Sequence, residues 1–280
     1  MSDKKPMDDA QLGNCLEQLA SVGYCILRDL IPSDRCGEIR DSVSAVVREQ
    51  RQNYSNAPAN VGFTPSVINH DQSFAEYLAN PRLLALVGRL LGEHVRISFT
   101  SAIINEPGNE RGGWHADWPF NQKNAGRILA PYPDAVVHLT TLWMLSPFDV
   151  SNGGTLVLPG SHTKSTNPTA IDAPDPNEHF ADEINVCGAA GSVLVMDSRL
   201  WHATAPNGTS EPRVALAVRY APWWLNLEVL RPEADERKRM CDETGATDNI
   251  VPSIRREVYE RLPPNVQSLY RHWIEPLSKE

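Results

Sequence analysis

Long apolar runs, a basic excess and paired cysteines are all missing from this 280-residue sequence. No apolar stretch approaches the roughly 20 residues that cross a bilayer, and the polar start offers no signal-peptide core, so we expect a cytoplasmic protein with no membrane partner. The net charge of -9 and the isoelectric point near 5.4 weigh against nucleic acid as a general partner, because binding a phosphate backbone requires a basic face. The 5 cysteines include no Cys-x-x-Cys pair, which favours reduced thiols.

The length and the texture of the chain predict a single domain over residues 1–280. We expect helical support over about 1–94, a β-rich core over about 95–222 and a helical extension over about 223–280. No internal repeat is visible, and nothing in the sequence points to a particular oligomeric state.

Short apolar segments separated by glycine, proline and asparagine predict a mainly β core, a sandwich or a barrel. The expected strands are Tyr24–Leu27, Val95–Asn105, Ala135–Leu145, Thr155–Leu158, Ser192–Met196 and Val214–Ala221. Helical spacing predicts helices around Leu12–Leu19 and over Ser33–Gln50, Pro81–Leu91, Val251–Arg261 and Val266–Trp273. The stretch Asn53–Thr64 lacks periodicity and is expected to be a loop, and the long polar stretch Thr163–Asn185 is a candidate lid or pocket wall.

The segment Gly112-Gly113-Trp114-His115-Ala116-Asp117 carries two metal-binding side chains two residues apart. In an extended chain His115 and Asp117 point to one face and Ala116 to the other. His202, after the expected strand that ends at Met196, is the natural third ligand. Two histidines and one carboxylate on one face are typical of non-haem Fe(II) oxygenases. A His-x-Asp sequence alone is common by chance, with the histidine capping a strand and the aspartate solvated.

Arg213 follows His202 by eleven residues and begins an expected strand. Its strand face carries Ala215, Ala217 and Arg219, and the small residues leave room for a ligand. A planar guanidinium suits bidentate pairing with a carboxylate such as the far end of 2-oxoglutarate. The alternative is that Arg213 pairs with an acidic side chain at the surface.

The order of these motifs resembles the phytanoyl-CoA dioxygenase family of Fe(II)/2-oxoglutarate oxygenases. The resemblance runs from Gly23-Tyr24-Cys25-Ile26-Leu27 to about Pro222, through Gly153-Gly154-Thr155, Pro159-Gly160-Ser161-His162 and the Gly191–Asp197 segment. It implies a double-stranded β-helix, or jelly-roll, core braced by helices, with Fe(II), 2-oxoglutarate and O2 as cofactor and cosubstrates. The implied metal ligands are His115, Asp117 and His202, with Arg213 on the cosubstrate.

The resemblance also implies a cosubstrate contact for Thr204, two residues after the distal histidine, and for Trp143. Strand alternation leaves open whether Trp143 or instead Thr140 or Thr141 points inward, and aromatic residues at such positions more often belong to the core. Trp118, Phe120 and His138 are candidate substrate contacts, although the rings could simply fill the core mouth and His138 could be a packed residue. His162, in a Gly-Ser-His turn, is expected to hydrogen-bond the backbone.

The resemblance implies hydroxylation of an unactivated carbon in a small-molecule substrate, possibly in natural-product or specialised metabolism. The same iron chemistry could give desaturation, epoxidation or cyclisation, and Asp117 weighs against a halogenase, in which a small residue replaces the carboxylate. A protein or nucleic-acid hydroxylase and a noncatalytic metal-containing binding protein are the other readings. The Pro-rich segment Trp118–Pro133 beside the metal motif is expected to act as a lid.

Overall fold

The computed structural model describes residues 5–53, 59–118, 134–169, 175–244 and 250–277. Its strands form two antiparallel sheets. The larger sheet holds β1 (Tyr24–Leu27), β2 (Val61–Pro65), β3 (Arg96–Asn105), β4 (Leu139–Met144), β7 (Val193–Asp197) and β9 (Arg213–Ala221), in the order β1-β7-β4-β9-β3-β2. The smaller sheet holds β5 (Thr155–Val157), β6 (Ile184–Val186) and β8 (His202–Thr204), in the order β6-β5-β8.

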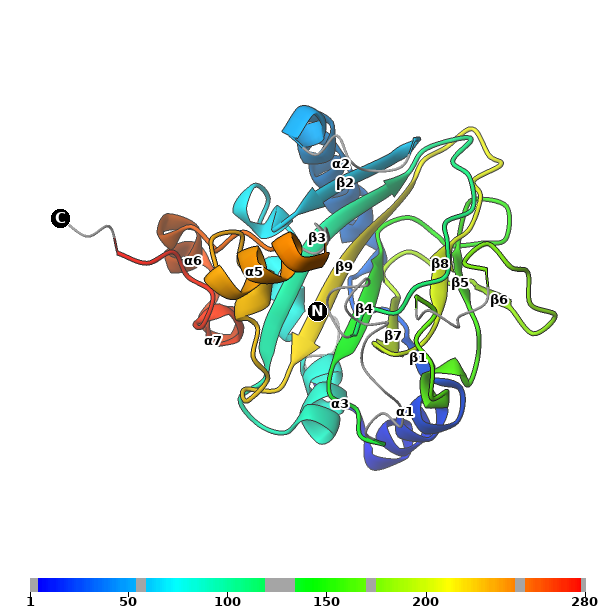
Figure 1. Ribbon diagram of the computed structural model, residues 1–280, viewed down its shortest axis with the longest axis horizontal. Coiled ribbons are helices and arrows are strands. Elements are labelled where there is room, and N and C mark those ends of the chain that lie inside the picture. The colour runs from blue at the N-terminus through cyan, green and yellow to red at the C-terminus, as the bar shows by residue number, and fades with distance from the viewer. Residues whose placement is uncertain (1–4, 54–58, 119–133, 170–174, 245–249, 278–280) are drawn as a thin grey trace.

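The two sheets share an apolar cluster, which identifies the layer between them. Leu142 and Ala217 of the large sheet belong to the same buried cluster as Val157 and Val186 of the small one. The described strands therefore form a two-sheet jelly-roll core, and they do not close into one continuous barrel. Figure 1 shows the small sheet at the right and the C-terminal helices at the left of the large sheet.

Helices from both ends of the chain cover the other face of the large sheet. They are α1 (Asp9–Val22), α2 (Ser33–Gln50), α3 (Pro81–Leu91), α6 (Arg256–Arg261) and α7 (Pro264–Tyr270), while α5 (Asp235–Thr244) contacts the short helical turn Glu228–Leu230. Helix α1 begins where the Asp8 carboxylate accepts a hydrogen bond from the Gln11 backbone N–H, and it ends at Gly23 with φ of 88°. None of the described helices has the length and apolar character required to span a membrane.

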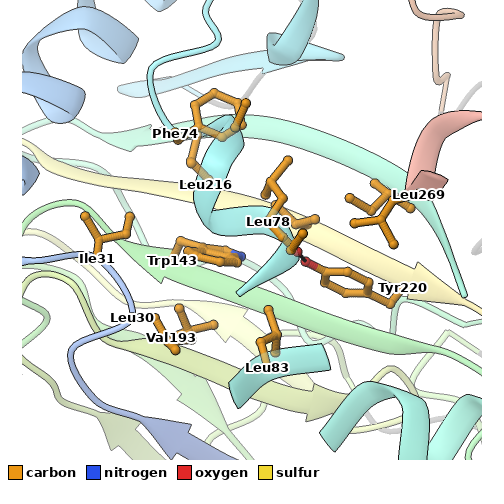
Figure 2. Close-up of a cluster of buried hydrophobic side chains, with 14 of the residues drawn as sticks. Leu30, Ile31, Phe74, Leu78, Leu83, Trp143, Val193, Leu216, Tyr220 and Leu269 are labelled. Carbon is orange, nitrogen blue, oxygen red and sulfur yellow. Dashed lines mark hydrogen bonds between the residues drawn. The ribbon is translucent and has the colours of Figure 1, made fainter. Parts of the chain in front are cut away.

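Large apolar side chains fill the space between these helices and the sheet (Figure 2). Trp143, Leu216 and Tyr220 point into this layer from β4 and β9, and the Tyr220 hydroxyl donates to the Leu78 carbonyl over 2.8 Å. We call this side of the sheet the helix face and the side toward the small sheet the inner face. The helix face is thus a conventional core that holds the strands in register.

The structure differs from the expected elements mainly at short strands. Strand β2 overlaps the end of the expected loop Asn53–Thr64, because pairing with the long edge of β3, Val61 opposite Asn105, supplies the order that the local sequence lacks. Strand β6 likewise overlaps the end of the expected lid or pocket wall Thr163–Asn185 and pairs with β5. The strand expected over Ala135–Leu145 begins only at Leu139, where pairing with β9 and β7 starts.

Candidate metal centre and its surroundings

Two histidines face each other as partners in an isolated backbone bridge. The His115 N–H donates to the His202 carbonyl over 3.0 Å, and the His202 N–H donates to the His115 carbonyl over 2.9 Å. The ring centroids lie 4.2 Å apart. Asp117, two residues on, is anchored by its own N–H on the Ser198 carbonyl over 2.8 Å, so main-chain hydrogen bonds position all three residues.

The metal-binding atoms of these residues form one cluster. One ligand atom each from His115, Asp117 and His202 lies within 4.8 Å of the others. Alternation along the segment places Trp114 on the opposite side, where it packs with Trp201 behind the small sheet. The expected three-residue site is therefore assembled, and the neighbouring tryptophans support it from outside.

Backbone carbonyls orient the two imidazoles. His115 Nδ1 lies 3.1 Å from the Gly113 carbonyl oxygen, and His202 Nδ1 lies 2.9 Å from that of Leu200. Because a carbonyl only accepts, each Nδ1 carries a proton, and Nε2 is the ring nitrogen left to face a metal. Burial and the neighbouring His202 ring lower the pKa of His115 to about 4, so this ring is neutral at physiological pH. Two imidazoles held in this way by backbone carbonyls fit a divalent transition metal.

Two side chains hold the carboxylate of Asp117. Arg219 Nη2 donates to Oδ1 over 2.5 Å, while Thr140 Oγ1 donates to Oδ2 over 2.7 Å. Oδ2 is also the oxygen that lies 3.5 Å from His202 Nε2. Burial alone would raise the pKa of Asp117, but Arg219 and the two imidazoles hold it well below its usual range. The carboxylate is therefore ionised, with Oδ2 nearest the imidazole and Oδ1 held by Arg219.

A chain of buried hydrogen bonds leads from Thr140 to His138. Thr140 Oγ1 lies 2.8 Å from Ser198 Oγ, which lies 2.7 Å from His138 Nδ1, and His138 Nε2 lies 2.8 Å from Ser98 Oγ. Thr140 gives its single proton to Asp117, so Ser198 must donate to Thr140 and His138 Nδ1 must donate to Ser198. Burial, with Arg219 nearby, lowers the pKa of His138 to about 3, so Nε2 is left to accept from Ser98. Every proton in this chain thus points toward Asp117.

Arg213 is a buried cation at the other end of β9. It is 3% exposed, its Nε donates to the Gly153 carbonyl over 2.9 Å, and its guanidinium carbon lies 4.4 Å above the Phe148 ring. Burial lowers its pKa to about 9, with no carboxylate contributing among the described residues. Gly153 has φ of 81°, and a Cβ there would lie 2.9 Å from the Ala205 carbonyl oxygen, which explains the need for glycine beside Arg213. The environment suits an incoming anion.

Small side chains separate the two arginines of β9. Ala215 and Ala217 lie on the inner face between Arg213 and Arg219. Six residues of strand span about 20 Å, and the two alanines leave this stretch of the inner face without large side chains. Thr204 lies two residues beyond His202 in β8 and shares its strand face. The structure thus brings Thr204 and Arg213 into the same layer as the metal-binding cluster.

The expected role of Trp143 is not supported by its position. Trp143 is fully buried on the helix face, and its Nε1 donates to Thr141 Oγ1 over 2.9 Å. The inner-face positions of β4 are Thr140, Leu142 and Met144, as the pairing of β4 with β9 requires. Of the open alternatives for this strand, Thr140 is therefore the residue at the site.

The remaining expected residues lie in three different settings. Trp118 is partly buried against the cluster between the sheets, one residue from Asp117. His138 is 1% exposed and has both ring nitrogens bonded to serines, so it supports the site from within the core. Phe120 and most of the expected lid Trp118–Pro133 lie outside the described residues. His162 hydrogen-bonds the backbone, as expected: its Nε2 lies 3.2 Å from the Ala20 carbonyl oxygen.

Four residues around Asp117 had no assigned role in the sequence-based site. Arg219 could be found from its strand face, which it shares with Arg213, and Thr140 from alternation in β4. Ser98 and Ser198 carry no recognisable spacing relative to the metal motif. They come from β3 and from the turn after β7, and only the packed fold brings them to His138.

Comparison with known proteins identifies the family to which the chain belongs. The phytanoyl-CoA dioxygenase (PhyH) family matches residues 19–215. The uncharacterized protein Rv1501 of Mycobacterium tuberculosis is 25% identical over 278 residues, 95% of this chain and 94% of that protein. Dioxygenase af480 of Aspergillus fumigatus is 32% identical over 166 residues, 58% of this chain and 48% of that protein.

A solved structure shares the fold at low sequence identity. The epimerase SnoN in complex with Fe3+, alpha ketoglutarate and nogalamycin RO superimposes with a TM-score of 0.56 at 19% identity, over 77% of this chain and 85% of that one. The family match includes His115, Asp117, His202 and Arg213 and ends within β9. On these grounds the chain belongs to the phytanoyl-CoA dioxygenase family.

Proposed function

We propose that this protein is an Fe(II)- and 2-oxoglutarate-dependent dioxygenase that hydroxylates an unactivated carbon of a small molecule. The observation that carries the proposal is the pairing of two sites in one layer. A three-ligand cluster with two outward Nε2 atoms lies at one end of β9, and a buried guanidinium with no carboxylate partner among the described residues lies at the other. Family membership and the Fe3+ and alpha ketoglutarate held by SnoN support the same conclusion.

His115, Asp117 and His202 would hold the iron. Two neutral imidazoles and one carboxylate form the ligand set that leaves the opposite coordination positions free for other molecules. Arg219 occupies Oδ1 of Asp117, so the carboxylate offers Oδ2 as its single metal-binding atom. The filled Asp117 position also leaves no place at that corner for a halide.

Arg213 would bind the far carboxylate of 2-oxoglutarate. A planar guanidinium makes two parallel hydrogen bonds to a carboxylate, and the low polarity around Phe148 strengthens such a pair. Ala215 and Ala217 provide the space along the strand, and the Thr204 hydroxyl lies on the same layer to assist. Once bound, iron and 2-oxoglutarate supply the activation of O2 that oxidises the substrate. The chain's own contribution is to ligate, to position and to exclude water.

The test is an anaerobic titration of the metal-free protein with Fe(II) and then 2-oxoglutarate, followed by the charge-transfer absorbance of the ternary complex. Wild type should develop the band, Asp117→Ala should lose it, and the exposed His94→Ala should match wild type. A normal band in Asp117→Ala with full iron content would refute the ligand assignment.

The reaction itself is tested by adding O2 and candidate substrates to the wild-type complex. A substrate that stimulates succinate formation and gains one oxygen atom supports hydroxylation. Loss of two hydrogens without oxygen gain would instead identify desaturation or ring closure. A stable complex that never consumes 2-oxoglutarate, with any compound, would identify a noncatalytic binding protein.

A further inference from the structure

An apolar cavity of about 640 Å3 opens at the end of the large sheet where β4 begins and β9 finishes. Its wall includes Leu90 and Leu91 from the end of α3, Val137 before β4 and Trp224 after β9. Every described residue of the wall is apolar or glycine, and none is charged. Cavities of roughly 300 to 1,000 Å3 are the usual size for small-molecule sites.

Three segments of the wall continue directly from the metal centre. Trp118 follows the metal-binding Asp117, and its N–H donates to the Ser198 carbonyl over 3.0 Å. Val137 precedes His138 of the hydrogen-bond chain, and Pro222 stands three residues after Arg219. Each segment leaves the site within three residues, so the cavity opens at the end of the sheet that carries Asp117 and Arg219.

The lining defines what chemistry the cavity accepts. A carboxylate or ammonium group placed there would lose its water and find no opposite charge among the described residues of the wall, which is costly. An apolar skeleton would instead gain contact with the tryptophan rings and aliphatic side chains. Trp224 is 56% exposed, an unusual position for so large an apolar side chain, and a ligand in the cavity would cover it.

We propose that this cavity binds the substrate of the metal centre, and that the part of the substrate it receives is uncharged and mainly apolar. This inference rests on the proposed function, because the bound molecule is a substrate only if the metal centre is catalytic. The substrate class follows from the apolar wall that Trp118, Val137 and Trp224 provide. The described part of the lining offers no partner for the charges of a zwitterion of amino-acid type.

The experiment compares two probes of equal chain length that differ in charge, 1-decanol and decanoate. Each is titrated calorimetrically into the anaerobic Fe(II)/2-oxoglutarate complex. Decanol should bind at least ten-fold more tightly than decanoate. Equal affinity for the two probes, or no saturable binding of decanol, would overturn the proposal.

Two variants locate the binding. Val137→Asp places a charge on the wall and should weaken decanol binding at least ten-fold, whereas Val150→Asp, at a side chain that is 71% exposed and outside the cavity wall, should leave it unchanged. Trp224→Ala, a change at the surface that spares the core, should weaken decanol binding about five-fold. Equal binding by Val137→Asp and Val150→Asp would place the decanol elsewhere and overturn the proposal.

The charge-transfer band of each sample separates this inference from the proposed function. A sample that shows the band but does not bind decanol defeats the substrate class alone. A protein that binds decanol in the cavity but never shows the band keeps the cavity assignment and defeats the proposed function.

Discussion

Alternate residues of β4 and β9 point to opposite faces of the large sheet, and the two faces differ in the charged side chains that they carry. The helix face presents Trp143, Leu216 and Tyr220 to a close-packed apolar layer. The inner face presents Thr140, and from β9 the charged Arg213 and Arg219 with alanines between them. The helix face is closely packed and these residues carry no charge, whereas the inner face combines charged side chains with small ones.

This difference indicates how the sheet divides its work. Large side chains on the helix face fix the strands in position, and that rigidity lets the inner face hold a buried cation and an ionised carboxylate at defined places. Charges of this kind destabilise a fold unless they have partners or ligands. The helix face therefore stabilises the sheet, while the inner face carries the ligand-binding chemistry.

Among variants that test the difference between the two faces, Trp143→Ala should have the largest effect on stability. Removing a fully buried tryptophan leaves a cavity and should lower the free energy of unfolding by about 3 to 5 kcal/mol, measured by urea denaturation. The 2-oxoglutarate affinity of the folded protein should stay within about two-fold of wild type, since the residue lies on the helix face. A loss of 2-oxoglutarate affinity without a loss of stability would show that Trp143 contributes to cosubstrate binding.

Arg213→Ala should give the opposite result. Removing one partner of a partly desolvated charge pair commonly costs about 2 to 5 kcal/mol, which corresponds to a loss of roughly 30-fold or more in 2-oxoglutarate affinity. Lysine should restore only part of it, because a point charge lacks the planar fork. The charge-transfer titration measures both variants. An unchanged dissociation constant would move the anchor to another residue, with Arg219 the first to test.

Thr140 and Thr141 offer a matched pair of neighbours on opposite faces. Thr140→Val removes the donor to Asp117 and should weaken Fe(II) binding about ten-fold, a typical effect for a group that orients a ligand. Thr141→Val removes contacts to the Val218 carbonyl and the Trp143 ring nitrogen, so it should lower stability by about 1 kcal/mol and leave Fe(II) affinity unchanged. Similar Fe(II) affinities in the two variants would contradict the division between faces.

The smallest effect concerns pH. His138 has a pKa of about 3 in the fold against 6.5 as the ordinary value, because burial and Arg219 disfavour its charged form. Between those values the unfolded chain binds a proton that the folded protein does not, so stability falls as pH decreases from about 6.5. His138→Asn should flatten this dependence by up to about 1.4 kcal/mol per pH unit between about pH 4.5 and 6. His179→Asn, at an exposed side chain, is the control that should keep the wild-type slope.

Much of the metal centre was predictable because its key relations are local. The two-residue spacing of His115 and Asp117 determines a shared face in any extended segment, and the same alternation groups Arg213 with Ala215, Ala217 and Arg219. The helices α1, α2 and α3 were also predictable, since each has helical apolar spacing, and α1 and α3 end at a glycine.

The errors occurred where pairing between distant strands decides the outcome. Which face of β4 points inward depends on its register with β9 and β7, and that register is absent from the local sequence. A register shift of one residue would turn Thr141 and Trp143 inward and turn Thr140 and Leu142 to the helix face, which is why the sequence did not settle the position of Trp143. Strand β2 and the serines around His138 could not be recognised for the same reason, since only the folded chain supplies their partners.

The reciprocal backbone bridge between His115 and His202 has a consequence for the life cycle of the protein. Main-chain hydrogen bonds hold these distant parts of the chain together, so closing that long loop does not depend on metal-ligand bonds. We therefore expect iron to bind a site that the folded chain already forms, unlike a small fold that requires its metal. Chelation should therefore be a reversible exchange in which the apoprotein stays folded and can be reloaded without renaturation.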